Sequence, residues 1–230
     1  MKAAALLLCA VWTSAFCVPV DMGLATVGAE STSILPVVGT WVVQQDGPTK
    51  VLAVDGGHWR EGTASPRVDA AAANLYAGDA NGFAEATKKH ASFPLAIVRD
   101  IPAFAEGTVT VRFKPLAGRE DQAAGIAFAI QPNGDYLILR ANALEDNLVL
   151  FEFRSGRRSA LKEVSGVPTK TGQWHELRLT VLGSEAAGAV DGKPYVKFDT
   201  GRAVAGRIGL WSKADSVVQF QRLDVQPLAR

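Results

Sequence analysis

The chain has 230 residues and a formal net charge of +1, with 24 basic and 23 acidic residues spread along its length. No basic cluster of the kind that nucleic-acid binding requires stands out in the sequence, so we expect no nucleic-acid partner. The length is sufficient for a single β-domain with a large hydrophobic core.

The N-terminal segment has the composition of an export signal. Lys2 precedes a long apolar run, and the small residues 27–29 fit a signal-peptidase site; Ala15 ends an earlier candidate site. We therefore predict a signal peptide over residues 1–29. The apolar run is too short to span a bilayer comfortably, so we expect an exported protein, periplasmic or extracellular, with no membrane span in the mature chain.

The next segments are expected to lead into a single domain. Residues 30–39 are predicted to form a tether, and residues 40–230 one β-sandwich domain. Its first strand is expected over residues 40–44. Over residues 70–92 the alanine-rich start fits a helical turn or a short strand, and residues 84–90 fit a turn of helix. We predict an irregular surface loop that includes one helical turn.

Clear strand patterns follow. Residues 108–114 alternate apolar and polar side chains, which is typical of a half-buried strand. Residues 125–158 contain three β-rich runs, and the first two are separated by Asn133-Gly134, a dipeptide that favours tight hairpin turns. Their apolar residues lie on both faces, which predicts the covered middle of a sheet.

The C-terminal third continues the pattern. Residues 173–182 alternate, Asp191-Gly192 is a second hairpin signal, and strands are expected in residues 206–212 and 217–225. About a dozen short strands at regular turn spacing predict an all-β fold, a jelly-roll sandwich of two antiparallel sheets.

Several phrases resemble a known family. GQWHELRL, the VDGK hairpin and GRIGLWSKADSVVQFQRLDV are similar to the closing half of concanavalin A-like jelly rolls. The similarity is closest to the laminin-G-like and 3-keto-disaccharide hydrolase-like (DUF1080-type) members found in secreted bacterial proteins, and it covers about residues 41–225. This resemblance implies the fold, but the fold carries lectins, glucanases and interaction modules alike.

Polar residues in the central strands are candidates for ligand binding. Arg140 and Asn142 end one predicted strand, and Glu145 follows in the next loop, so together they offer donors and acceptors to sugar hydroxyls. The alternative is structural: Arg140 pairs with Glu145 or Glu152, and Asn142 caps the turn. Arg112 and Gln122 have the same two interpretations.

Two tryptophans and a lysine complete the candidates. Trp59, in a glycine-rich loop, is suited to stacking on a sugar ring. Trp211 precedes Lys213, and these two residues either contribute to the site or form a core tryptophan followed by a surface turn.

Cofactor binding has weak support. The histidines share no metal-ligand spacing, and both cysteines lie in the predicted leader. Asp121, Asp135 and Asp146 are weak candidates for a calcium ion.

A glycan partner is the leading functional prediction, with the protein acting as a carbohydrate-binding, non-catalytic module. The Glu-x-Asp-x-x-Glu string of the glucanases of this fold is absent. Two alternatives stay open: a glycoside-cleaving enzyme of the 3-keto-disaccharide hydrolase type, which the resemblance implies, and a laminin-G-like protein–protein interaction domain. The sequence does not determine the oligomeric state.

Overall fold

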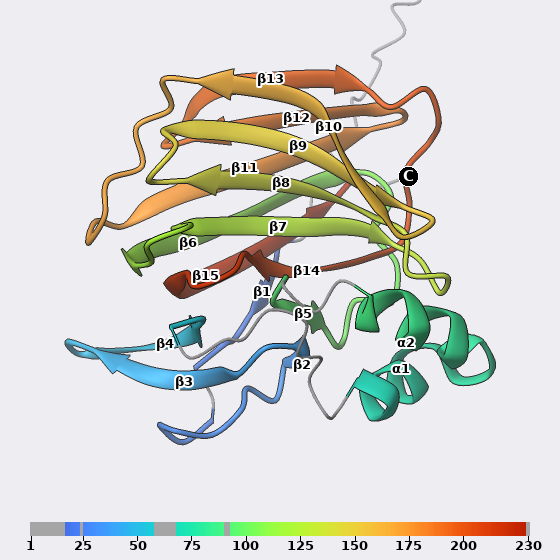
Figure 1. The fold of residues 1–230 in the computed structure, drawn as a ribbon, viewed down its shortest axis with the longest axis horizontal. Coiled ribbons are helices and arrows are strands. Elements are labelled where there is room, and N and C mark those ends of the chain that lie inside the picture. Colours follow the sequence, from blue (N-terminus) through green and yellow to red (C-terminus); the bar gives the residue numbers. More distant parts are fainter. Residues whose placement is uncertain (1–16, 24, 58–67, 90–92, 229–230) are drawn as a thin grey trace, which may run out of the picture.

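The computed structural model describes residues 17–23, 25–57, 68–89 and 93–228. In this part of the chain the strands form two antiparallel sheets, stacked as a sandwich (Figure 1). The predicted all-β, jelly-roll fold class is confirmed.

The larger sheet places the last strand of the chain in its interior. Its order is β13 (Lys193–Asp199), β12 (Glu185–Val190), β11 (His175–Leu182), β6 (Gly107–Ala117), β15 (Val217–Pro227), β4 (Thr49–Asp55) and β3 (Trp41–Asp46), and β1 (Val18–Val20) also pairs with β15. The smaller sheet has the order β10 (Arg157–Ser165), β9 (Asn147–Arg154), β8 (Tyr136–Asn142), β7 (Ala123–Ile130), β14 (Arg207–Ser212), β5 (Leu95–Val98) and β2 (Ile34–Val38).

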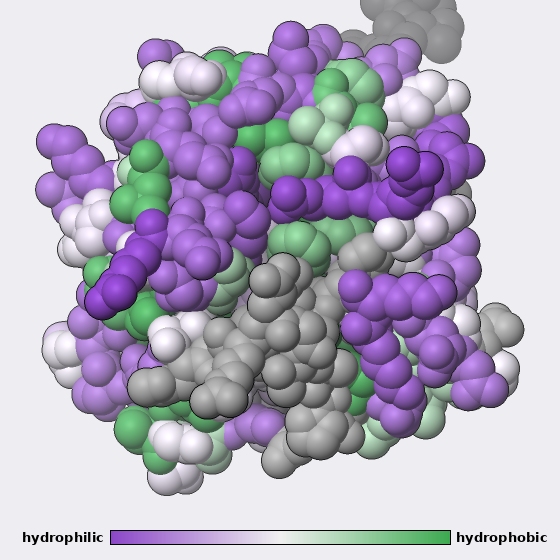
Figure 2. All heavy atoms as spheres, in the orientation of Figure 1, coloured by the Kyte–Doolittle hydropathy of each residue, from purple (hydrophilic) through white to green (hydrophobic). Residues whose placement is uncertain are grey.

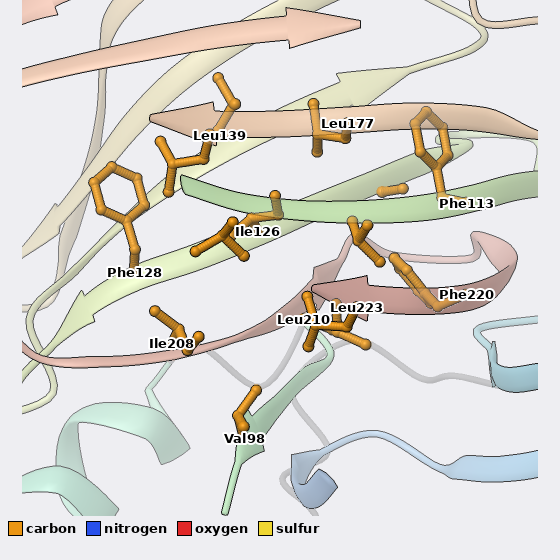
Figure 3. Packing of buried hydrophobic residues seen from close by; sticks show 14 of the residues in the cluster. Val98, Phe113, Ile126, Phe128, Leu139, Leu177, Ile208, Leu210, Phe220 and Leu223 are labelled. Atoms are coloured by element: carbon orange, nitrogen blue, oxygen red, sulfur yellow. The ribbon is translucent and has the colours of Figure 1, made fainter. Parts of the chain in front are cut away.

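The main core fills the space between the sheets. Ile126 and Leu139 from the smaller sheet meet Phe113 and Leu177 from the larger one, and all four are fully buried (Figure 3). The alternation predicted over residues 108–114 is confirmed, because β6 buries every second side chain in this core. Each buried side chain of this size contributes about 1.5–3 kcal/mol relative to an exposed one.

The central strands are covered on both faces, as the sequence predicts. Strands β7, β8 and β9 are neighbours, and every residue of β7 and β8 is buried. Leu139 points into the main core, whereas its neighbour Ile138 belongs to a second apolar cluster on the outer face of the smaller sheet. Trp211 and two helices complete this second cluster.

The surface loop predicted over residues 70–92 is wrong for residues 70–88, and residues 90–92 lie outside the described part of the chain. The segment forms α1 (Val68–Tyr76) and α2 (Ala80–Lys88), joined by a short 3₁₀ turn and lying beside β2 and β5 (Figure 1). Four buried residues of α1 follow the helical spacing i, i+3, i+4 and i+7: Val68, Ala71, Ala72 and Leu75. Two of the four are alanines, whose weak hydrophobicity hid the pattern.

The tether predicted over residues 30–39 is also wrong for its second half. Ile34, Val37 and Val38 are fully buried, and β2 pairs with β5. Pro36 suggested an irregular segment, but β2 is the edge strand of its sheet, where a residue without an N–H group is tolerated.

Residues within the predicted leader also belong to the sandwich. Strand β1 pairs with β15, and both Val20 and Met22 are buried. Further along, the Gly28 N–H donates to the Val43 carbonyl, and the Val43 N–H donates to the Ala29 carbonyl. Cleavage after Ala29 would remove this strand, whereas cleavage after Ala15 would keep it.

No helix in the described ranges is long and apolar enough to cross a membrane.

We predict that a chain starting at Glu30 is less stable than one starting at Phe16. It loses the β1–β15 pairing and the burial of Val20 and Met22, which together are worth about 3–5 kcal/mol. Urea unfolding of both chains measures the difference. Equal stabilities would show that β1 contributes nothing to the sheet.

Candidate functional site

Four neighbouring strands of the smaller sheet begin or finish at the same end of the sheet. Register pairs place Asn142, at the end of β8, opposite both Ala123, which starts β7, and Asn147, which starts β9. Ser212, at the end of β14, pairs with Ala124. Polar residues far apart in the sequence therefore lie side by side at this end of the sheet.

Arg140 is the centre of this group. Its side chain is only 3% exposed and lies on the outer face of the sheet, one residue beyond the core-facing Leu139. Its Nη1 donates to Glu145 Oε2 at 2.8 Å, and its guanidinium lies 5.3 Å from the ring centroid of Phe151. The Nε atom has no hydrogen-bond partner among the described residues.

A buried carboxylate supports the group from below. Asp121 is 2% exposed, accepts from Asn142 Nδ2 at 2.8 Å and pairs with Lys213 Nζ at 2.7 Å. Its Oδ1 also lies 3.9 Å from Arg140 Nη1. Asn142 in turn accepts from the N–H groups of Gln122 and Leu144, which holds the two loops together.

Asn147 joins two carboxylates on the solvent side. Its Nδ2 donates to Glu145 Oε2 at 3.0 Å and to Glu163 Oε1 at 2.8 Å. The Oδ1 of this buried side chain has no partner among the described residues. The group therefore contains a buried donor and a buried acceptor that no described residue satisfies.

The turn after β14 fixes the segment that carries Asp121. The Asp215 carboxylate accepts from the N–H groups of Arg119, Glu120 and Asp121 at 2.6–3.3 Å. Ser216 Oγ accepts from the Ala123 N–H at 3.0 Å. We call this arrangement the turn clamp: residues 212–216 holding residues 119–123.

Gly118 lets the backbone bend tightly just before Asp121. Gly118 has a φ of +143°, and a Cβ atom there would lie 1.8 Å from the Asp121 carbonyl oxygen. No other residue type fits without moving the backbone, so Gly118 permits the tight bend that the turn clamp stabilises.

A polar hollow of about 500 Å³ lies at Arg140 on the outer face of the smaller sheet, and we call it the Arg140 pocket. Its walls are formed by Arg140, Glu145, Asn147, Phe151, Arg158, Glu163 and Lys213.

Charge pairing keeps Glu145 ionised. Burial alone would raise the pKa of this carboxyl, but the charge and hydrogen bond of Arg140, the hydrogen bond from Asn147 and the charge of Lys213 together hold the pKa below its usual value. At neutral pH Glu145 is therefore an acceptor for hydrogen bonds and not a donor.

The structure brings together five of the predicted site residues. They come from the loop before β7, from the end of β8 with its following loop, and from the turn after β14: Gln122, Arg140, Asn142, Glu145 and Lys213. The structural interpretation of Arg140 is confirmed, because it pairs with Glu145. It also lines the pocket, and its role in ligand binding stays a prediction.

The other predicted residues lie elsewhere. Arg112 is on the outer face of the larger sheet, where it bonds to Gln221 and lies over Trp174. Trp211 is fully buried and stacks on Phe93, with ring centroids 5.5 Å apart. Trp59 lies outside the described residues.

Sequence reasoning missed two wall residues on β10, Arg158 and Glu163. They are five positions apart, so a regular strand would place them on opposite faces. A bulge between Ala160 and Lys162 shifts the register and puts both on the outer face. Only the pairing with β9 reveals this, because a bulge of this kind has no clear sequence signal.

The three weak calcium candidates are engaged separately. Asp121 bonds to Asn142 and Lys213, whereas Asp135 accepts from the Ser155 N–H and from Asn133. Asp146 adopts a positive φ in the turn before β9. Across the described ranges, no three His, Cys, Asp or Glu side chains come close enough to hold a metal ion.

The fold is that of concanavalin A-like sandwiches. No protein-family model and no curated protein matches the sequence. Among solved structures, the carbohydrate-binding module CBM66 from Bacillus subtilis superposes with a TM-score of 0.58 at 15% identity, covering 84% of this chain and 94% of that one. A Bacillus licheniformis β-glucanase gives 0.51 at 9% identity, covering 95% of both chains.

A third structure, a Bacillus subtilis protein of unknown function with a galectin-like fold, gives a TM-score of 0.52 at 13% identity. It covers 86% of this chain and 89% of that chain. At these identities the likeness establishes the fold alone, so function has to be argued from the site.

We predict that Asp215→Ala destabilises the protein by about 2–3 kcal/mol at neutral pH, because it removes a charged acceptor from three backbone N–H groups. Burial opposes the ionised form, but these hydrogen bonds hold the pKa of Asp215 below its usual value. The difference from wild type should therefore be complete above about pH 4 and fade as pH falls through the lowered pKa.

Urea unfolding at several pH values measures this difference. Asp199→Ala is the matched control, since that exposed carboxylate accepts from a single backbone N–H, of Gly201, and its loss should cost much less. Equal effects of the two substitutions would contradict the turn clamp.

Proposed function

We propose that this chain is an exported, non-catalytic carbohydrate-binding protein whose glycan site is the Arg140 pocket. The observation that carries the proposal is that strands β8, β9 and β10 and the turn after β14 contribute fixed donors and acceptors to one hollow. The ligand would be a glycan of the cell envelope or the surroundings.

The wall chemistry suits sugar hydroxyls. Each hydroxyl donates one hydrogen bond and accepts others, so a sugar site needs charged donors beside ionised acceptors. Arg140 and Lys213 supply donors, and Glu145 and Glu163 supply acceptors. Asp121 pairs with Lys213 and lies 3.9 Å from Arg140, and Asn147 bonds to both glutamates. Because these contacts already hold the side chains, little rotamer freedom is lost on binding.

The fold is compatible with this function. Proteins named as a carbohydrate-binding module and as a glucanase share the two-sheet architecture over most of the chain. This agreement supports a glycan ligand but does not choose between binding and hydrolysis.

Hydrolysis is the second candidate, and one observation favours it. Glu145 and Glu163 accept from the same amide nitrogen of Asn147, so their carboxylates are near neighbours. A retaining glycosidase uses two carboxyls about 5 Å apart, one of them a protonated acid. The lowered pKa of Glu145 is the opposite of the shift that an acid requires, which favours binding.

A protein–protein interaction domain has less support. The large hydrophobic side chains exposed in the described ranges are scattered over different segments: Val18, Val27, Leu144, Leu182 and Leu228. On the face seen in Figure 2, hydrophilic side chains predominate and hydrophobic ones form small separate patches. The described residues on this face form no large contiguous apolar patch, which is the usual mark of such a partner site.

We predict that oligosaccharides raise the melting temperature of the protein, since a ligand that binds only the folded state stabilises it. Glu163→Ala should abolish this shift without unfolding the chain, because Glu163 is exposed and makes a single hydrogen bond, to Asn147. A thermal-shift screen with calcium, and again with a chelator, also tests whether a metal ion contributes.

Glu176→Ala is the matched control. Glu176 lines a polar hollow of about 460 Å³ on the outer face of the larger sheet. Loss of binding in Glu176→Ala but not in Glu163→Ala would move the site to that sheet. Release of reducing sugar by the wild type, abolished in Glu163→Ala, would establish hydrolysis instead.

A further inference from the structure

Arg158 lines the Arg140 pocket, and no described residue hydrogen-bonds to its guanidinium. Its guanidinium carbon lies 5.0 Å from the ring centroid of Phe93 and 4.9 Å from that of Phe151. It forms no hydrogen bond and no ion pair with any residue that the structure describes. Two phenyl rings thus hold the guanidinium in place while its N–H groups stay available.

The other cations of the pocket are already matched. Arg140 pairs with Glu145, and Lys213 pairs with Asp121. Arg158 is the one cation on the pocket wall for which the described residues provide no carboxylate within ion-pair distance. Arg140 also lies against Phe151, so two guanidiniums share one ring.

The surroundings of Arg158 disfavour its charge. Burial lowers the pKa of Arg158, and the like charge of Arg140 lowers it further, although the charges of Asp121, Tyr136 and Glu145 act in the opposite direction. A negative group bound at the Arg158 guanidinium would relieve this cost. Arginine is suited to such a group, because its planar fork matches an oxyanion with two parallel hydrogen bonds.

We propose that the glycan bound in the Arg140 pocket is acidic, and that Arg158 binds the carboxylate or sulfate of one of its sugar units. This inference rests on the proposed function and adds the class of ligand to it. Arg158, with Phe93 and Phe151, forms the part of the pocket that would bind the acidic group. The hydroxyl groups of a neighbouring sugar would reach the acceptors at the other end.

Glu163 sets the direction in which the glycan lies. The bulge in β10 places it on the same face as Arg158 but five residues further along, where its carboxylate bonds to Asn147. A carboxylate repels an anion but accepts from a hydroxyl. The acidic group must therefore lie toward Arg158, and neutral hydroxyls toward Glu163.

Isothermal titration calorimetry with matched pairs of oligosaccharides tests this proposal. In each pair the acidic member is an oligouronate. The neutral member is its carboxyl-reduced form, which keeps the sugar ring. Sulfated oligosaccharides and their desulfated forms make a second arm that separates sulfate from carboxylate. We expect the acidic member to bind at least about tenfold more tightly, with a preference that weakens as salt is added.

Variants assign the preference to one residue. Arg158→Gln should remove the preference, so that this variant binds the acidic and the neutral member of a pair with equal affinity. Arg158→Lys, which keeps the charge but not the planar fork, should retain part of it. Arg178→Gln, on the outer face of the larger sheet, is the matched control and should change nothing.

The outcomes separate the two proposals. Equal binding of acidic and neutral members in the wild type would overturn the acidic ligand and leave the glycan site standing. A preference that survives in Arg158→Gln would overturn the role of Arg158. Binding of no member in either arm would overturn both proposals.

Discussion

The turn clamp is the contact on which the site depends. Asp215 holds three consecutive backbone N–H groups, and Lys213 pairs with the carboxylate of Asp121, the last residue of that run. Asp121 in turn holds Asn142, whose Oδ1 fixes the loops on either side. One turn of five residues thus connects the last strand of the smaller sheet to the buried base of the pocket.

Charge in this region is balanced in layers. The inner layer pairs the buried Asp121 with Lys213 and the buried Arg140 with Glu145, so the cost of removing Asp121 and Arg140 from water is offset by partners of opposite sign. The outer layer holds Arg158 and Glu163, which face solvent at opposite ends of the hollow. The inner layer orients the wall, and the outer layer is where selectivity for a ligand would arise.

Much of this architecture could be predicted from sequence, for physical reasons that also explain the failures. Asn133-Gly134 and the apolar runs with two buried faces identify β7 and β8. Antiparallel pairing of these strands then brings Gln122, Arg140, Asn142 and Glu145 to the same end of the sheet. Helix α1 was missed because alanine carries a weak hydrophobic signal, and β2 because Pro36 resembles a break. Arg158 and Glu163 were missed because a bulge reverses the side-chain alternation.

The position of β15 has a consequence for how the molecule assembles. This final strand lies between β6 and β4, and it also pairs with β1 from the opposite end of the chain. β14, the strand before it, occupies an interior place between β7 and β5. Neither sheet is complete until residues 207–227 have been synthesised, because β14 and β15 lie inside their sheets. Such long-range closure makes folding slow and leaves the incomplete sheets exposed to aggregation in the meantime.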